Sequence, residues 1–241
     1  MMRQLQLWDP RDTEQLWSVR HSPRARRLSV RVFRHGGVEI VVPPRTSPQR
    51  VSAFVSEHRE WIERQRLRSA PTRQWPLPPP ALVLTALDEH WECLPGAGDG
   101  RPGIRQIGER QLRLEGDLSE RGRLRQLLRR WLMERATLRF QPQLQAHAAR
   151  MGVRPVQLQV RCQRTRWGSC SRRGTISLNA CLLFQRPEVV RYLMIHELSH
   201  LRHMNHSARF WNEVSRHEPH WKALDRELLK GWRLVPSWMF Q

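Results

Sequence analysis

A histidine, a glutamate and a second histidine form the pattern H-E-x-x-H at His196, Glu197 and His200. On a helix, two histidines four residues apart project from the same face about one turn apart, so both imidazoles can reach one Zn²⁺ ion. The glutamate beside the first histidine is displaced by about 100° around the helix, where it can accept a proton from an attacking water without becoming a ligand. The pattern therefore predicts a catalytic zinc site with Glu197 as general base for hydrolysis.

Catalytic zinc usually takes three protein ligands, and the candidates for the third are His203, His206 and Glu213. His203 stands seven residues after His196, roughly 10 Å along a continued helix, so it does not converge easily on the same ion. His206 stands six residues after His200, the offset of the third ligand in the pattern H-E-x-x-H-x-x-G-x-x-H, although His203 takes the glycine position. Glu213 would give the other common arrangement. We favour His206 and keep Glu213 as the alternative.

The helix that carries this motif can be placed from its own sequence. Pro187 stands where a helix takes its first residue. Four apolar residues fall on the face opposite the two histidines: Val190, Met194, Leu198 and Leu201. Two further helices are expected from about Ser207 and from about Pro219, with Gly231 as the natural end of the last one.

The first part of the chain reads as strands with a helix between them. Apolar residues alternate over residues 28–42 around Gly36 and Gly37, which predicts a β-hairpin and a small N-terminal sheet. Over residues 48–68 they recur at three- and four-residue spacings, so a helix is expected to cover one face of the hairpin. The five prolines of residues 70–80 indicate a stiff linker or an extended edge, and a soft boundary is expected there.

Short strands are expected at residues 81–87, 91–94 and 111–115, as an extension of the first sheet. From about Leu118 an amphipathic pattern predicts a long helix that is interrupted or kinked near Pro142. The boundary between an N-terminal region and the rest of the chain is therefore expected just before this helix.

Two more strands are expected at residues 156–161 and 175–182, separated by the arginine-rich loop QRTRWGSCSRRG. The order of elements indicates an α+β fold. We predict an N-terminal β-rich region over residues 1–117, with one helix and the proline-rich linker, and a catalytic domain over residues 118–241.

Composition bears on where the protein works. No run of 18 or more apolar residues occurs, and the first residues lack the basic segment and apolar stretch of a secretory signal. The cysteines include no C-x-x-C pair, so neither a disulfide framework nor a cysteine-rich zinc module is indicated. There are four of them: Cys93, Cys162, Cys170 and Cys181. We expect a soluble cytoplasmic protein with reduced thiols and no transmembrane segment.

The formal net charge of +20 comes from 42 Lys+Arg residues against 22 Asp+Glu residues. Such a charge attracts polyanions, including nucleic acid, nucleotide phosphates, anionic membrane surfaces and acidic proteins, without choosing among them. Because the basic residues are scattered along the chain, they also fit an ordinary solvated surface. Nucleic acid or nucleotide is therefore kept as a partner class beside a polypeptide substrate.

Three stretches carry a resemblance to a known family: TRWGSCS at 165–171, ISLNACL at 176–182 and VVRYLMIHELSHLRHMNHSARFW at 189–211. They resemble the YgjP-like metallopeptidase domain, a bacterial relative of the SprT-like and WLM zinc peptidases. The similarity in order and spacing runs from about residue 120 to 232. RRLSVRV, VVPP and HREWIERQ extend it to the N-terminal part.

The resemblance implies a minimal zincin-like metallopeptidase domain with His196, His200 and His206 as zinc ligands and Glu197 as base. This agrees with the choice of His206 made from spacing. Oligomeric state and cleavage preference do not follow from it.

The R-W-G-S-C stretch is characteristic of the family, and two interpretations of it stay open. In one, Arg166 and Ser169 contact the substrate or form a strand edge. In the other, Trp167 and Gly168 shape a tight turn packed under the metal helix.

Three functions stay open as well. A cytoplasmic zinc peptidase would bind an extended peptide at a strand edge, for which residues 175–181 are the candidate. A metal-dependent nucleoside triphosphate pyrophosphohydrolase, an activity associated with the family, would hold phosphates with nearby arginines, although no glycine-rich phosphate loop is found. These arginines are Arg164, Arg166, Arg172 and Arg173. A DNA-associated protease recruited by charge is the third, since SprT-like relatives act on proteins bound to DNA.

Overall fold

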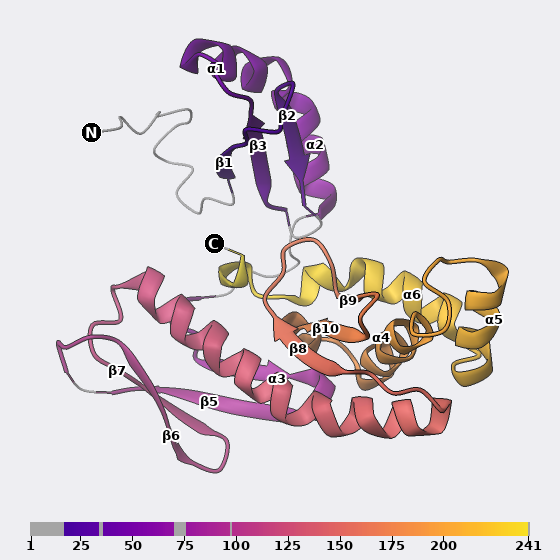
Figure 1. Ribbon diagram of the computed structural model, residues 1–241. Helices are drawn as coiled ribbons and strands as arrows, with labels where there is room; N and C mark the ends of the chain where they lie inside the picture. Colours follow the sequence, from indigo (N-terminus) through magenta and orange to yellow (C-terminus); the bar gives the residue numbers. More distant parts are fainter. Residues whose placement is uncertain (1–16, 34–35, 70–75, 97, 241) are drawn as a thin grey trace. The chain divides into compact units, whose positions relative to one another are not determined.

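The computed structural model describes residues 17–33, 36–69, 76–96 and 98–240 (Figure 1). It is a mixed α+β structure with three small sheets, and it divides into two compact units. The first unit is Met1–Arg73 with Phe240–Gln241, and the second is Gln74–Met239. This division falls within residues 70–80, where the proline-rich segment suggests a soft boundary. The predicted domains, residues 1–117 and 118–241, stay a prediction. Residues 70–75 of the predicted proline-rich linker lie outside the described residues.

The first unit contains a three-stranded sheet in the order β1-β3-β2. Its strands are β1 (Trp17–His21), β2 (Ser29–Val32) and β3 (Val38–Val42). Strands β2 and β3 pair antiparallel, as the predicted hairpin requires, whereas β1 pairs parallel to β3 and was not predicted. A parallel partner about twenty residues away leaves no local sequence pattern.

Two helices follow where one was predicted: α1 (Pro48–Glu57) and α2 (Arg59–Ser69). The break falls at His58, whose backbone leaves the helical region and whose Nδ1 lies 2.9 Å from the carbonyl oxygen of Phe54. Both helices contribute to a small apolar core with the sheet, formed by Val38, Ile40, Val42, Val51 and Ile62.

The second unit begins with a four-stranded sheet in the order β4-β5-β7-β6. Its strands are β4 (Ala81–Leu84), β5 (Glu89–Pro95), β6 (Gly103–Gly108) and β7 (Gln111–Glu115), with the 3-10 turn η1 (Thr85–Leu87) after β4. The prediction that these strands extend the first sheet is therefore wrong, because they form a sheet of their own. Strand β6 was not predicted.

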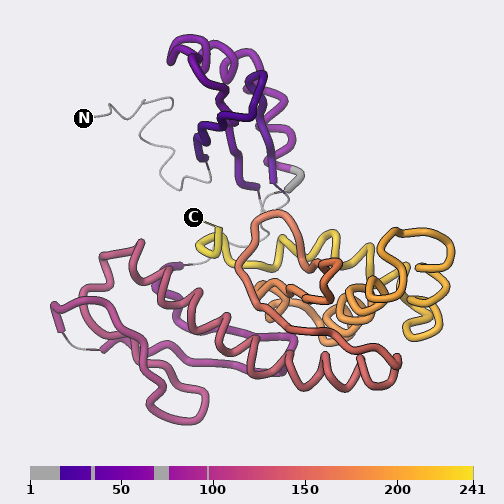
Figure 2. Tube along the Cα trace, in the orientation of Figure 1, coloured from indigo at the N-terminus to yellow at the C-terminus, as the bar shows by residue number. Residues whose placement is uncertain are grey.

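Helix α3 (Arg121–Met151) is 31 residues long and contains Pro142 without the interruption that was one of the two predicted possibilities, the other being a kink. Figure 2 traces it as one long coil. The residues buried along it recur every four positions: Leu124, Leu128, Leu132, Ala136, Phe140, Leu144 and Ala148. This spacing gives a continuous apolar stripe, which lets a single helix cover several elements of the unit.

The four-stranded sheet belongs with α3 because of a buried ion cluster around Glu89. Arg135 Nε donates to Glu89 Oε2 at 2.8 Å, and Arg139 and Arg110 lie 3.1 and 3.0 Å from the same carboxylate. Burial acts to raise the pKa of Glu89, but the hydrogen bonds from Arg135 and Trp91 outweigh it and lower the pKa to about 2. The carboxylate is thus ionised and joins β5 to α3 within the second unit.

The third sheet has the order β8-β10-β9 and lies beside α4 (Figure 1). Its strands are β8 (Gln157–Arg161), β9 (Gly168–Cys170) and β10 (Thr175–Asn179), and the 3-10 segment η2 (Ala180–Phe184) follows. Strand β9 lies within the stretch predicted as a loop. It takes the edge position, so β10 is the central strand and residues 175–181 are not the strand edge that was predicted.

The chain closes with three helices, α4 (Pro187–Ser199), α5 (Ala208–His217) and α6 (Trp221–Lys230), and the 3-10 turns η3 (Gly231–Leu234) and η4 (Ser237–Met239). The predicted start at Pro187 and the predicted stop at Gly231 are confirmed. Helix α4 packs against α3, α5, α6 and β9. Among the described helices, none is long and apolar enough to cross a membrane.

Candidate metal centre

Three histidines converge at the end of α4. His196 and His200 come from the end of α4, and His206 comes from the loop that leads to α5. Their nearest ring nitrogens all lie within 4.8 Å of one another, and His196 Nε2 is 3.2 Å from His206 Nε2. Two nitrogens bound tetrahedrally to one zinc ion are about 3.3 Å apart. The cluster therefore fits the donor set and spacing of a metal site.

Hydrogen bonds determine which ring nitrogen of His196 and of His200 is free to bind a metal. His200 Nδ1 lies 3.1 Å from the carbonyl oxygen of His203, an acceptor, so Nδ1 carries the proton. Tyr192 donates its hydroxyl hydrogen to Asp225 Oδ1 at 2.9 Å and, as an acceptor, lies 3.4 Å from His196 Nδ1. Both histidines are thereby held with Nε2 free of a proton and able to bind a metal.

One aromatic side chain contacts all three histidine rings. Phe210, the fully buried third residue of α5, has ring-centroid distances of 4.9 Å to His196, 4.5 Å to His200 and 4.8 Å to His206. Trp211 stacks on the exposed third histidine at 5.6 Å. Helix α5 therefore fixes the position of a ligand that α4 does not carry.

The electrostatics of the cluster keep the first two imidazoles neutral. Burial, together with the neighbouring His200 and His206, lowers the pKa of His196 to about 3. Burial also lowers the pKa of His200. Neutral imidazole is the form that binds a metal, so these two ligands need not lose a proton at pH 7.

Glu197 lies buried beside this cluster, next to the edge strand β9. Burial raises its pKa to about 8 in the metal-free protein, against an opposing effect of the Arg166 guanidinium. Gly168 of β9 passes so close that an added Cβ would sit 2.6 Å from Glu197 Oε1. A residue with any side chain at 168 would displace the carboxylate, so glycine is required there by this close approach.

The other predicted site residues occupy separate positions. Glu213, the alternative third ligand, is buried, forms an ion pair with Arg202 at 2.7 Å and lies 3.4 Å from His217 Nε2, and it is not part of the metal cluster. His203 contributes its carbonyl group to His200. Arg166 is exposed in the loop before β9, and Ser169 is the half-buried middle residue of β9.

The loop that carries Arg166 is anchored by a buried asparagine at the end of β10. Asn179 Nδ2 donates to the carbonyl oxygens of Gln163 and Arg166 at 2.8 and 2.9 Å, and its Oδ1 accepts from the Cys181 amide at 3.0 Å. Trp167 is buried, with its ring stacked 3.9 Å from that of Trp232. The stretch therefore contributes the edge strand β9 (Gly168–Cys170), which packs against α4, where the second interpretation expected a tight turn at Gly168.

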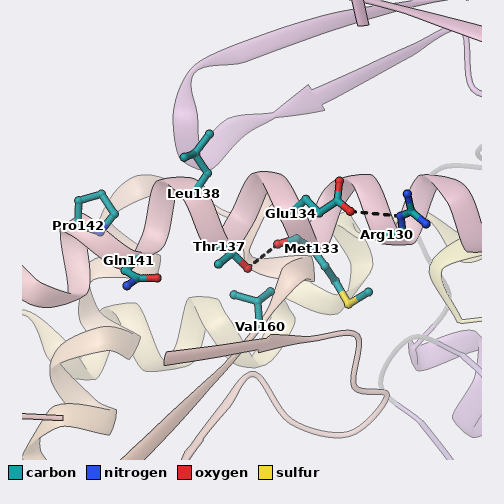
Figure 3. Close-up of a pocket in the computed structure, with 8 residues that line it drawn as sticks. All are labelled: Arg130, Met133, Glu134, Thr137, Leu138, Gln141, Pro142 and Val160. Atoms are coloured by element: carbon teal, nitrogen blue, oxygen red, sulfur yellow. Dashed lines mark hydrogen bonds and ion pairs between the residues drawn. The ribbon is translucent and has the colours of Figure 1, made fainter. Parts of the chain in front are cut away.

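A cavity of about 660 Å³ lies away from this centre, along α3 (Figure 3). Seven of its eight lining residues belong to α3, and the eighth is Val160 of β8. None of the three clustered histidines lines it. The chemistry of the histidine cluster therefore does not depend on this cavity.

Sequence reasoning missed three residues that shape the centre, Tyr192, Phe210 and Asp225, and it named Gly168 only as part of a tight turn under the metal helix. Tyr192 stands four residues before His196, so its place on the same helix face could have been read from spacing. Asp225 reaches it from α6, 33 residues away, and no local pattern signals that contact.

A family model described as YgjP-like, metallopeptidase domain, matches residues 26–230. A comparison with curated proteins found no match. Among solved structures, the metallopeptidase zymogen abylysin of Pyrococcus abyssi is 27% identical over 35% of this chain and 87% of its own, with a TM-score of 0.33. On the match over residues 26–230, which spans most of its length, the chain belongs to the YgjP-like metallopeptidase domain family.

Proposed function

We propose that this protein is a zinc-dependent peptidase in which His196, His200 and His206 hold the metal and Glu197 is the general base. The observation that carries the proposal is the convergence of three imidazole nitrogens beside a buried carboxylate. Family membership supports peptide bonds as the target. The zincin-like architecture implied by the sequence is part of the same proposal.

Three neutral imidazoles are a donor set that zinc accepts, and when bound it would supply a Lewis acid to polarise the scissile carbonyl. Glu197 accepts the proton of the attacking water and then delivers it to the amine leaving group. A nearby dication favours the ionised form of a carboxyl group. The buried Glu197, mostly protonated at pH 7 without metal, thus becomes a base when the metal is present.

Strand β9 offers the substrate a backbone to pair with. The amide of Ser171 donates to the Thr175 carbonyl, and the amide of Asn179 donates to the Trp167 carbonyl. By alternation along the antiparallel ladder, the backbone groups of Gly168 and Cys170 face away from β10. In the described sheet β9 has no second partner, so an extended peptide can add there and pass the Glu197 carboxylate.

The roles proposed for Arg166 and Ser169 follow from this path. The backbone of Ser169 is used by β10, so its contribution to substrate binding comes through its hydroxyl. Arg166 precedes the strand, is exposed and lies near enough to affect Glu197 electrostatically. Its guanidinium is proposed to bind a carbonyl or carboxylate group of the substrate near the scissile bond.

The test is hydrolysis by the purified full chain, loaded with zinc or stripped by a chelator, with casein and a panel of nucleoside triphosphates as substrates. We expect peptide products only with metal present, detected by mass spectrometry. Pyrophosphate release without peptide products would reject the peptidase in favour of a nucleotide hydrolase. Peptide products only when DNA is added would point to a DNA-recruited protease.

Substitution of Gly168 by alanine should reduce peptidase turnover by about 100-fold, because a displacement of roughly 1 Å at the reacting groups costs that much. The new Cβ would meet Glu197 Oε1 at 2.6 Å, so the carboxylate must move. Bound zinc should be unchanged by metal analysis. Gly103→Ala is the matched control, since an added Cβ at Gly103 meets nothing within 4 Å. Equal activity of the two variants would contradict the placement of the base against β9.

Substitution of Tyr192 by phenylalanine should weaken zinc binding by about 10- to 100-fold, the usual effect of removing a partner that orients a ligand. The variant removes only the hydroxyl that lies between His196 and Asp225. Competition with a chromophoric chelator measures the affinity, and Asp225→Asn should produce a smaller loss. An unchanged zinc affinity in Tyr192→Phe would show that this hydroxyl does not orient the ligand.

A further inference from the structure

The first unit contains a cavity with an unusual concentration of positive charge. It has a volume of about 570 Å³, and its lining includes Arg26, Arg27, Arg45 and Arg50 against a single carboxylate, Glu57. Apolar side chains complete the wall, among them the half-buried Phe54. The arginines come from the β1–β2 connection, the turn after β3 and the first turns of α1, so the fold brings together residues from three segments.

These guanidinium groups are not neutralised by the described part of the protein. None of the four lies within 4 Å of an Asp or Glu carboxylate among the ion pairs of the described residues. Four positive charges against one negative leave three uncompensated in one cavity. Like charges gathered this way repel each other, and a bound anion removes that cost.

Two local features add to the positive field. Helix α1 begins at Pro48 beside the cavity, and its first turn contains no acidic residue to offset the positive end of the helix. Arg45 has a φ of 59°, a left-handed conformation that is sterically unfavourable for a non-glycine residue. An arginine therefore stands where glycine would be favoured, as expected where the side chain has a role.

We propose that this arginine pocket, defined by Arg26, Arg27, Arg45 and Arg50, binds a compact polyphosphate such as the diphosphate or triphosphate group of a nucleotide. The net charge of three matches such a group, and guanidinium forks bind phosphate oxygens in pairs. The volume lies in the range of small-molecule sites.

Isothermal titration of the full chain with inorganic triphosphate, without added metal and at about 0.15 M salt, tests the proposal. We expect one ligand per chain, with affinity at least about tenfold weaker in Arg45→Gln/Arg50→Gln, since each charged hydrogen-bond partner contributes about that factor. Arg59→Gln/Arg64→Gln is the control. It makes the same charge change on α2 in the same unit, away from the cavity lining, and should weaken binding far less.

Equal weakening by the two double variants would reduce the binding to general charge attraction and overturn the proposal. So would the absence of triphosphate binding, or binding of a short single-stranded oligonucleotide in its place. All four arginines are exposed, so their substitution leaves the apolar core of the unit intact. The assay uses neither zinc nor hydrolysis. A negative result here and a negative result for the peptidase are therefore independent.

Discussion

Replacing Glu197 with glutamine should lower peptide hydrolysis at least about 100-fold, the usual contribution of a general base, while leaving the bound zinc unchanged. Glutamine preserves the shape of the side chain but cannot accept the proton of the attacking water. Glu197 is buried, and Gly168 passes close to its carboxylate. Initial rates on a fluorogenic peptide library and metal analysis of the same samples measure both quantities.

Glu188→Gln is the matched control, since it makes the same change at the start of α4, far from the histidines. Calorimetry supplies a second readout, because the pKa of Glu197 is about 8 without metal. At pH 7 the carboxyl group of Glu197 is mostly protonated without metal, so zinc binding to the wild type should release up to about one proton more than zinc binding to Glu197→Gln. As the pH rises through 8, Glu197 loses this proton before zinc binds, and the difference between the two proteins should vanish. Full activity in Glu197→Gln would exclude this residue as the base.

Replacing His206 with alanine should weaken zinc binding by more than about 100-fold, beyond the loss expected for a residue that only orients a ligand. The substitution removes the third imidazole and leaves two donors on one helix, too few to enclose the ion. The ring of His206 is exposed, so its loss should change the free energy of unfolding of the metal-free protein little. Competition with a chelator measures the zinc affinity, and chemical denaturation without metal measures the free energy of unfolding.

Glu213→Gln separates the two candidates for the third ligand. The Glu213 carboxylate is engaged by Arg202 and His217, so its loss should lower the free energy of unfolding by about 1–3 kcal/mol and leave zinc affinity unchanged. The opposite pattern, with zinc lost in Glu213→Gln and kept in His206→Ala, would identify Glu213 as the ligand.

Local sequence signals predicted the parts of the fold that depend on neighbours along the chain. The hairpin around Gly36 and Gly37, the helix start at Pro187 and the stop at Gly231 each follow from a turn or cap preference within a few residues. The convergence of His206 with the first two histidines also follows from spacing.

Strand pairing and contacts between helices could not be predicted in this way. Strand β9 is three residues long and contains a glycine, so it carries no alternation, and its identity comes from β10. The strands from β4 to β7 show good alternation, but nothing local says that they pair with each other and dock on α3 through Glu89. Periodicity reports which face of an element is buried, and it does not name the partner.

The contact of Phe210 with all three histidine rings has a consequence for how this centre can change. A side chain shared by three ligands transmits the displacement of one to the other two, so the effects of substitutions in this group are not additive. Once one of these four side chains has been replaced, replacing a second one should reduce zinc affinity by less than the same replacement does in the wild type. Phe210 and the three histidines therefore act as one coupled group, and the effect of a substitution at one of them depends on the identity of the other three.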